Sequence, residues 1–166
     1  MERVEAPQGI EALEDALARA DFEVRHEVLG GEAALVARRA AWKTGLAHMH
    51  FFVVVFDSPE LDVDRAENLT AAAQQYAIKH KGGLPRGLQT GTATVAVFLA
   101  RPSESLQAWF AADPRHRFAA LRFPVLADLD SGSVTYFKGR MARGSVYQAD
   151  LRTIADDIVK PALAPE

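Results

Sequence analysis

The sequence predicts one α+β domain, residues 1–166, in which helices pack on a mixed β-sheet. The length suits one domain, and 49% hydrophobic with 25% charged residues is typical of a globular chain with its own core. Two apolar runs, at 48–56 and 92–100, flank a strongly periodic helical segment. A buried strand, a helix and a second buried strand form a crossover unit, so we expect these two strands to be parallel.

The first half of the chain predicts a helix followed by three strands. We expect the helix at 9–20 and the strands at 22–29, 33–43 and 48–56. The first strand alternates apolar and polar residues, which predicts one exposed face, whereas the third is apolar throughout and should be covered on both faces. Gly30 and Gly31 lie between the first two strands and suit the positive φ angles of a tight hairpin.

The second half predicts a long helix, a strand, a short helix, two strands and a final helix. In the long helix, at 62–80, Asp64 and Glu67 fit a capping box. Pro124 restricts its strand to an edge or a bulge, and Pro161 is expected to end the last helix. The expected order is α-β-β-β-α-β-(α)-β-β-α, with strands at 92–100, 118–127 and 133–138, a short helix opened by 102–103 and a last helix at 147–159.

Composition excludes several classes of function. The formal net charge is only −3, so we expect no binding to nucleic acid or to an anionic membrane surface. The chain has no cysteine, which excludes disulfides, thiolate zinc sites and cysteine nucleophiles. The start of the sequence lacks the pattern of a secretory signal, and its longest apolar run, 51–56, is far shorter than a membrane helix. We therefore expect a cytoplasmic protein.

The element order resembles two known folds. The first hundred residues resemble the core of restriction-endonuclease-like folds, which implies acidic residues and a lysine on the second and third strands, binding metal for phosphodiester cleavage. Glu32 begins the second strand here, but the third carries His48, Met49 and His50 and no lysine, so the usual motif is missing. The order also resembles secretion-chaperone-like domains, which implies a dimer that binds an extended segment of a partner. Both resemblances concern topology only.

Two pairs of polar residues could hold a metal ion. His48 and His50 are two apart on a strand and so point to one face, and with Asp57 they could contribute to a zinc or iron site. The alternative is that both histidines are polar residues at the start of a strand. Asp128 and Asp130 have the same spacing and could bind a hard cation, but the glycine and serines after them are also typical of a hairpin turn.

The segment 80–91 is the most unusual stretch of the chain, because it combines four glycines with a proline and several basic residues. Glycine-rich loops can offer backbone N–H groups to an anion. It lacks the ending of a phosphate-binding loop, so a long connection with several positive φ angles is the alternative. We expect the ligand or partner contacts of this loop at Lys81, Gly83, Arg86, Gly87 and Gln89.

No motif in the sequence is specific to a catalytic mechanism. The first hypothesis is therefore a non-catalytic binding or interaction domain that forms a homodimer or binds another protein, with no cofactor. The alternative is a metal-assisted hydrolase, acting on phosphodiesters, that uses a divalent metal and some of His48, His50, Asp57, Asp128 and Asp130. That alternative requires these side chains to meet in space.

Overall fold

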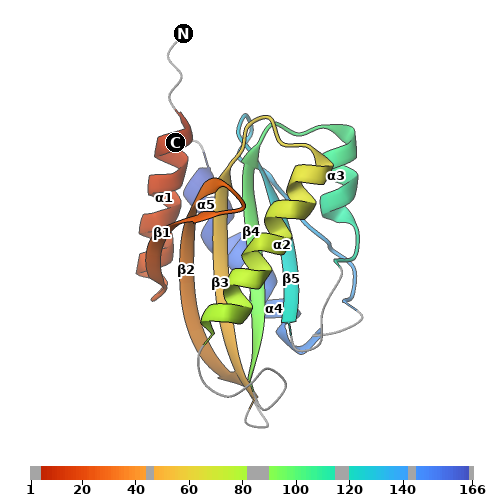
Figure 1. Cartoon of the computed structure of the whole chain (residues 1–166). Helices are drawn as coiled ribbons and strands as arrows, with labels where there is room; N and C mark the ends of the chain where they lie inside the picture. The colour runs from red at the N-terminus through yellow and green to blue at the C-terminus, as the bar shows by residue number, and fades with distance from the viewer. Residues whose placement is uncertain (1–4, 44–46, 82–89, 115–119, 142–144, 165–166) are drawn as a thin grey trace.

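The computed structural model describes residues 5–43, 47–81, 90–114, 120–141 and 145–164. Within these ranges no helix is both long and apolar enough to cross a membrane. The elements follow the expected order (Figure 1). They are α1 (Glu5–Arg19), β1 (Glu23–Leu29), β2 (Glu32–Lys43), β3 (Ala47–Asp57), α2 (Val63–His80), β4 (Thr90–Ala100), α3 (Glu104–Ala111), β5 (Ala120–Asp128), β6 (Val134–Thr135), α4 (Ser145–Thr153), a π-helical segment η1 (Ile154–Val159) and α5 (Lys160–Leu163).

The strands form one mixed sheet of six strands, whose spatial order equals their order in the chain. β1, β2 and β3 form an antiparallel meander, whereas β3, β4 and β5 are parallel. The predicted α+β class and the predicted parallel pairing of β3 with β4 are therefore confirmed. The carboxyl ends of the three parallel strands lie at one end of the sheet, which is where open sheets of this kind often bind ligands.

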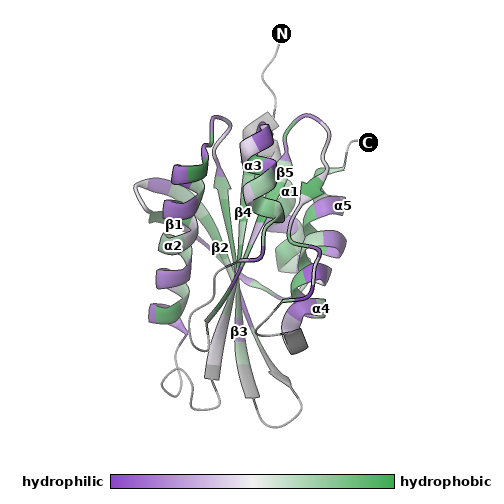
Figure 2. Cartoon of the chain, turned by 90° about the vertical axis from the view of Figure 1, so that its right-hand side faces the viewer, coloured by the Kyte–Doolittle hydropathy of each residue, from purple (hydrophilic) through white to green (hydrophobic). Residues whose placement is uncertain are grey.

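Helices cover both faces of the sheet, so the molecule has three layers (Figure 2). Side chains of β3 alternate between two cores. Phe51, Val53 and Val55 pack toward α1 and the C-terminal helices. Phe52 and Phe56 pack toward α2 and α3. All five are at most 2% exposed, which confirms that an apolar strand without alternation is covered on both faces.

The N-terminus of α2 is capped by Asp62, whose Oδ1 accepts a hydrogen bond of 2.7 Å from the backbone N–H of Arg65. The predicted capping box of Asp64 and Glu67 is wrong, because the helix begins two residues earlier than such a box requires. The third helical residue is consequently Arg65, whose long side chain is free to contact another element.

The last helix continues past Pro161, so the prediction that this proline ends it is wrong. Proline cannot donate to the carbonyl four residues before it and also crowds that group. The chain accommodates Pro161 by widening into the π-helical segment η1 immediately before it, and α5 then adds one more turn. Tyr136 Oη also donates a 2.7 Å hydrogen bond to Asp156 in η1, which fastens this segment to the chain after β6.

Pro124 lies near the far edge of the sheet, where its strand was predicted to be. β6 pairs only with Leu126 and Ala127, so Pro124 lies on a part of β5 that is hydrogen bonded on one side, to β4. The return strand is much shorter than the predicted 133–138, because only Val134 and Thr135 pair with β5.

The β1–β2 hairpin turns at Gly30 and Gly31, which have φ angles of 59° and 82°. Positive φ at both central residues is the geometry of a tight hairpin turn, as predicted. Gly30 also lies against α2: a Cβ atom on it would come within 2.9 Å of Leu69 Cδ2, whereas one on Gly31 would meet nothing within 4 Å. The tip of the hairpin therefore bends over the end of the sheet toward α2 (Figure 1).

Alanine substitution at the two glycines tests this contact. Both variants place a Cβ atom in the left-handed region, which costs about 1–2 kcal/mol. Gly30→Ala must also displace Leu69, so we expect it to lower the free energy of unfolding by about 1 kcal/mol more than Gly31→Ala. Urea denaturation of the two variants measures the difference, and equal losses would show that the hairpin tip does not pack on α2.

Candidate functional site

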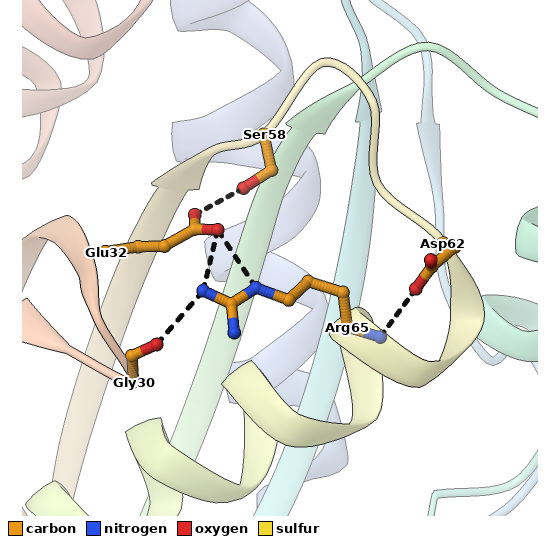
Figure 3. Close-up of polar contacts among 5 residues, drawn as sticks. All are labelled: Gly30, Glu32, Ser58, Asp62 and Arg65. Atoms are coloured by element: carbon orange, nitrogen blue, oxygen red, sulfur yellow. Dashed lines mark hydrogen bonds and ion pairs between the residues drawn. The ribbon is translucent and has the colours of Figure 1, made fainter.

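A network around Arg65 fixes the hairpin tip to the start of α2 (Figure 3). We call it the Arg65 clamp; its members are Gly30, Glu32, Ser58, Asp62 and Arg65. The guanidinium donates to Glu32 Oε1 from Nε at 3.0 Å and from Nη2 at 2.8 Å, and to the carbonyl oxygen of Gly30 at 3.0 Å. Ser58 donates to the other carboxylate oxygen of Glu32 at 2.8 Å. A carboxylate with three donors is a well-satisfied acceptor.

The clamp ties together three segments that are distant in the sequence. Glu32 belongs to the start of β2, Ser58 follows β3, and Arg65 lies in the first turn of α2. Because Arg65 also contacts Gly30, the turn between β1 and β2 is held on the α2 side of the sheet. On the opposite side of the hairpin, the side of α1, His26 and Val28 are exposed.

A hollow of about 700 Å³ lies on that opposite side, between α1 and the hairpin. We call it the hairpin groove; its lining includes Ile10, His26, Val28, Ala33, Leu35 and Asp57. Ile10 belongs to α1, and the other five come from β1, β2 and β3. The groove is thus mostly apolar, and its polar members are His26 on one flank, Glu27 beside it and Asp57 at the end of β3.

Val28 is the most unusual residue of the groove. Its exposed fraction is 72%, and among the described residues it is the one large hydrophobic side chain that is exposed. It lies on β1, which is an edge strand of the sheet. A large apolar side chain on an unpaired edge beside a hollow is a feature of binding surfaces.

Asp57 is the second unusual residue. Its Oδ1 atom is buried, and no described group donates a hydrogen bond to it. Burial raises the pKa of this carboxyl above its ordinary value, and the nearby negative charge of Glu32 raises it further. Glu32 accepts hydrogen bonds from Arg65 and Ser58, so of these two neighbouring carboxyl groups only Glu32 has described donors on both of its oxygens. Buried polar groups without partners are uncommon in folded proteins and often mark functional positions.

His26 forms the flank of the groove nearest to α1. Its Nε2 atom lies 3.2 Å from both carboxylate oxygens of Glu14. This contact ties β1 to α1 and defines one wall of the hairpin groove.

The structure does not bring the predicted metal-ligating residues together. His50 and Asp57 lie near opposite ends of β3, about 23 Å apart at the rise of a strand. They also face different sides of the sheet, because His50 shares a face with Phe52 and Asp57 shares one with Val55. His50 is 4% exposed, with Nδ1 3.5 Å from Arg38 Nη2. His48 belongs to β3, but its side chain lies outside the described residues.

No metal-binding group of three His, Asp or Glu residues occurs in the described ranges. Asp128 and Asp130 form the turn that the alternative interpretation predicted. The carboxylate of Asp128 accepts from the N–H of Asp130 and from Ser131 Oγ, both at 2.8 Å. The N–H of Gly132 donates to the carbonyl of Asp128, and its φ of 74° is one that glycine favours.

Of the predicted loop residues, the structure describes only Lys81, because Gly83, Arg86, Gly87 and Gln89 lie outside the described ranges. Lys81 is 7% exposed, and its carbonyl oxygen accepts a 3.0 Å hydrogen bond from Arg38. The point at which this loop leaves α2 is therefore fixed to β2. Its role as a ligand or partner contact stays a prediction.

A second hollow, of about 460 Å³, lies between α2 and α3 over β5. Its floor includes Arg122, which is 8% exposed and donates a 3.2 Å hydrogen bond to Glu67 at the wall. Trp109 forms another wall. In this hollow the buried charge of Arg122 is already paired with Glu67. The buried oxygen of Asp57 has no described donor, so the hairpin groove is the better candidate for a binding site.

Comparison of the chain with protein-family models, with curated proteins and with solved structures finds no match in any of the three.

Sequence patterns predicted part of this groove. The strand at 22–29, which contributes His26 and Val28, was predicted, and Asp57 was named as a candidate site residue, although as a metal ligand. The patterns missed Arg65 and the exposure of Val28. The available signal was the third position of α2, where an arginine replaces the glutamate of a capping box.

Substitution of Asp57 by asparagine tests its environment. The pKa of Asp57 is higher in the folded chain than its ordinary value of 3.8, so ionisation of Asp57 destabilises the fold. This loss of stability is absent below about pH 3.8, grows as the pH rises toward the pKa of the folded state, and is complete above that pKa. At neutral pH we expect Asp57→Asn to raise the free energy of unfolding by on the order of 1 kcal/mol. The gain should shrink in acid.

Thermal unfolding of the wild type and of Asp57→Asn over a series of pH values measures this effect. Asp15→Asn, at an exposed position of α1, is the matched control and should change little at any pH. A loss of stability in Asp57→Asn at neutral pH would mean that the carboxylate has a stabilising partner.

Proposed function

We propose that this chain is a non-catalytic interaction domain that binds an extended segment of a partner protein in the hairpin groove, alongside β1. The observation that carries the proposal is the 72% exposure of Val28 on an edge strand beside an apolar hollow. Burying such a side chain against a partner gains roughly 1.5–3 kcal/mol.

The backbone of β1 supports an extended ligand. In the described part of the chain β1 pairs with β2 alone, so half of its N–H and C=O groups point away from the sheet. A segment that adds as a further strand pairs with these groups, while its alternate side chains face the groove. Backbone pairing supplies affinity, and the groove supplies specificity.

A second copy of the chain is the alternative occupant of this edge. α1 lies beside β1, because Glu14 contacts His26. Two copies paired through β1 about a two-fold axis perpendicular to the sheet would place both α1 helices on the same face, next to each other. The homodimer expected from the sequence thus becomes an outcome to be tested, and light scattering detects it directly.

Selection from a displayed library of random linear peptides tests the proposal. We expect the wild type to enrich peptides that Val28→Arg no longer binds, because arginine removes the apolar contact and adds a charge beside the groove. Ala111→Arg, at an exposed position of α3 on the other face, is the matched control and should keep binding. Enrichment that is identical on wild type and Val28→Arg would overturn the proposal.

We also propose that the domain acts in the cytoplasm. The supporting observation is the absence of cysteine, since domains of oxidising compartments commonly carry disulfides. Fractionation of cells that express the tagged full chain tests the location.

The alternative function is a metal-assisted hydrolase of phosphodiesters. One observation favours it: Glu32 and Asp57 are close enough for the charge of Glu32 to raise the pKa of Asp57. However, Arg65 and Ser58 already occupy the carboxylate of Glu32. Calorimetric titration with Mn²⁺ distinguishes the two functions. We expect no binding, whereas binding that Asp57→Asn abolishes would favour the hydrolase.

A further inference from the structure

We infer that the segment bound in the hairpin groove carries a lysine or arginine whose side chain pairs with Asp57. This inference rests on the proposed function and names the chemical class of its ligand. It follows from the position of Asp57, from the charges around the groove and from the spacing of the groove residues.

Asp57 is placed to receive a positive charge. It ends β3 and lies on the same face as Val55, which is the face toward α1 and the groove. The positive partner of the neighbouring Glu32, Arg65, comes from α2 on the opposite face. The clamp therefore neutralises Glu32 and leaves no described cation for Asp57.

The charges around the groove have one sign at neutral pH. No lysine or arginine occurs among the described residues that line it, and Asp57 lies on its face of the sheet. Glu27 also borders the groove, but its carboxylate accepts a hydrogen bond from Tyr76 of α2 on the other face. The one basic residue described in the groove, His26, lies against Glu14 of α1. A cationic side chain would therefore meet a negative, partly dry site, where charge-assisted contacts are strong.

The apolar lining of the groove determines which other side chains the ligand should carry. Ile10, Val28 and Leu35 offer hydrophobic surface beside Asp57. In an extended segment only alternate side chains face the groove. We therefore expect a basic residue with apolar residues two positions away, and charge or polarity at the intervening positions.

Acid should weaken this recognition. Protonation of Asp57 removes the attraction, and its pKa is raised by burial and by Glu32. His26 and Glu14 lie together on the flank of the groove, and any proton that this pair gains adds positive charge there. These changes oppose a cation, so the affinity of a basic peptide should fall as the pH falls.

The peptides selected on the full-length chain test the inference. We expect a lysine or arginine at one position of every peptide whose binding is lost in Val28→Arg. Replacing that residue by methionine should weaken binding about tenfold, and Asp57→Asn should cause a similar loss with no further loss when both changes are combined. Glu104→Gln, at an exposed position of α3, is the control and should have no effect.

A charge exchange gives the sharpest result. Asp57→Lys should reject the basic peptides and recover binding when their lysine or arginine is replaced by glutamate. Peptides that require Val28 but show no basic preference, and that bind Asp57→Asn as well as the wild type, would overturn this inference and leave the proposed function intact. Peptides that do not depend on Val28 would contradict the proposed function itself.

Discussion

The ion pair between Arg65 and Glu32 determines the shape of the end of the molecule that contains the hairpin groove. Hydrogen bonds between neighbouring strands fix the middle of the sheet, but the tip of a two-stranded hairpin has few contacts of its own. Arg65 provides them by binding Glu32 and the carbonyl of Gly30 at once. The hairpin is thereby held toward α2, and the face that it turns away from α2 becomes the wall of a groove.

The clamp also gives two neighbouring carboxyl groups different roles. Glu32 receives donors from Arg65 and Ser58 and serves the structure. Asp57 receives none from the described residues and keeps a buried oxygen without a partner. A residue that costs stability in the free protein is compatible with function when a ligand supplies the missing partner. The same division weakens the case for a metal centre, which would need both carboxylates.

Sequence patterns predicted the fold well because hydrophobic periodicity determines which face of each element is buried. The unbroken apolar run of β3 and the glycine pair at 30–31 each specified their structure locally. The alternation of β1 predicted a strand but not its burial, because Val28 on the apolar side is 72% exposed. The patterns failed where the outcome depends on contacts between distant segments. Pro161 was tolerated by a local π-helical turn, and His50 and Asp57 were separated by the length of one strand. The groove could not be predicted, because it depends on Arg65 reaching a hairpin that precedes it by more than thirty residues.

The most direct test of this account is the affinity of a selected peptide for Arg65→Met, measured by calorimetry together with hydrogen exchange at the amides of β1. Arg65 does not line the groove, so the account predicts an indirect effect: faster exchange near the hairpin tip and an affinity about tenfold weaker. Arg101→Met breaks the exposed Arg101–Glu60 pair instead and should change neither. Unchanged affinity and unchanged exchange in a folded Arg65→Met variant would contradict the central claim that the Arg65 clamp shapes the hairpin groove.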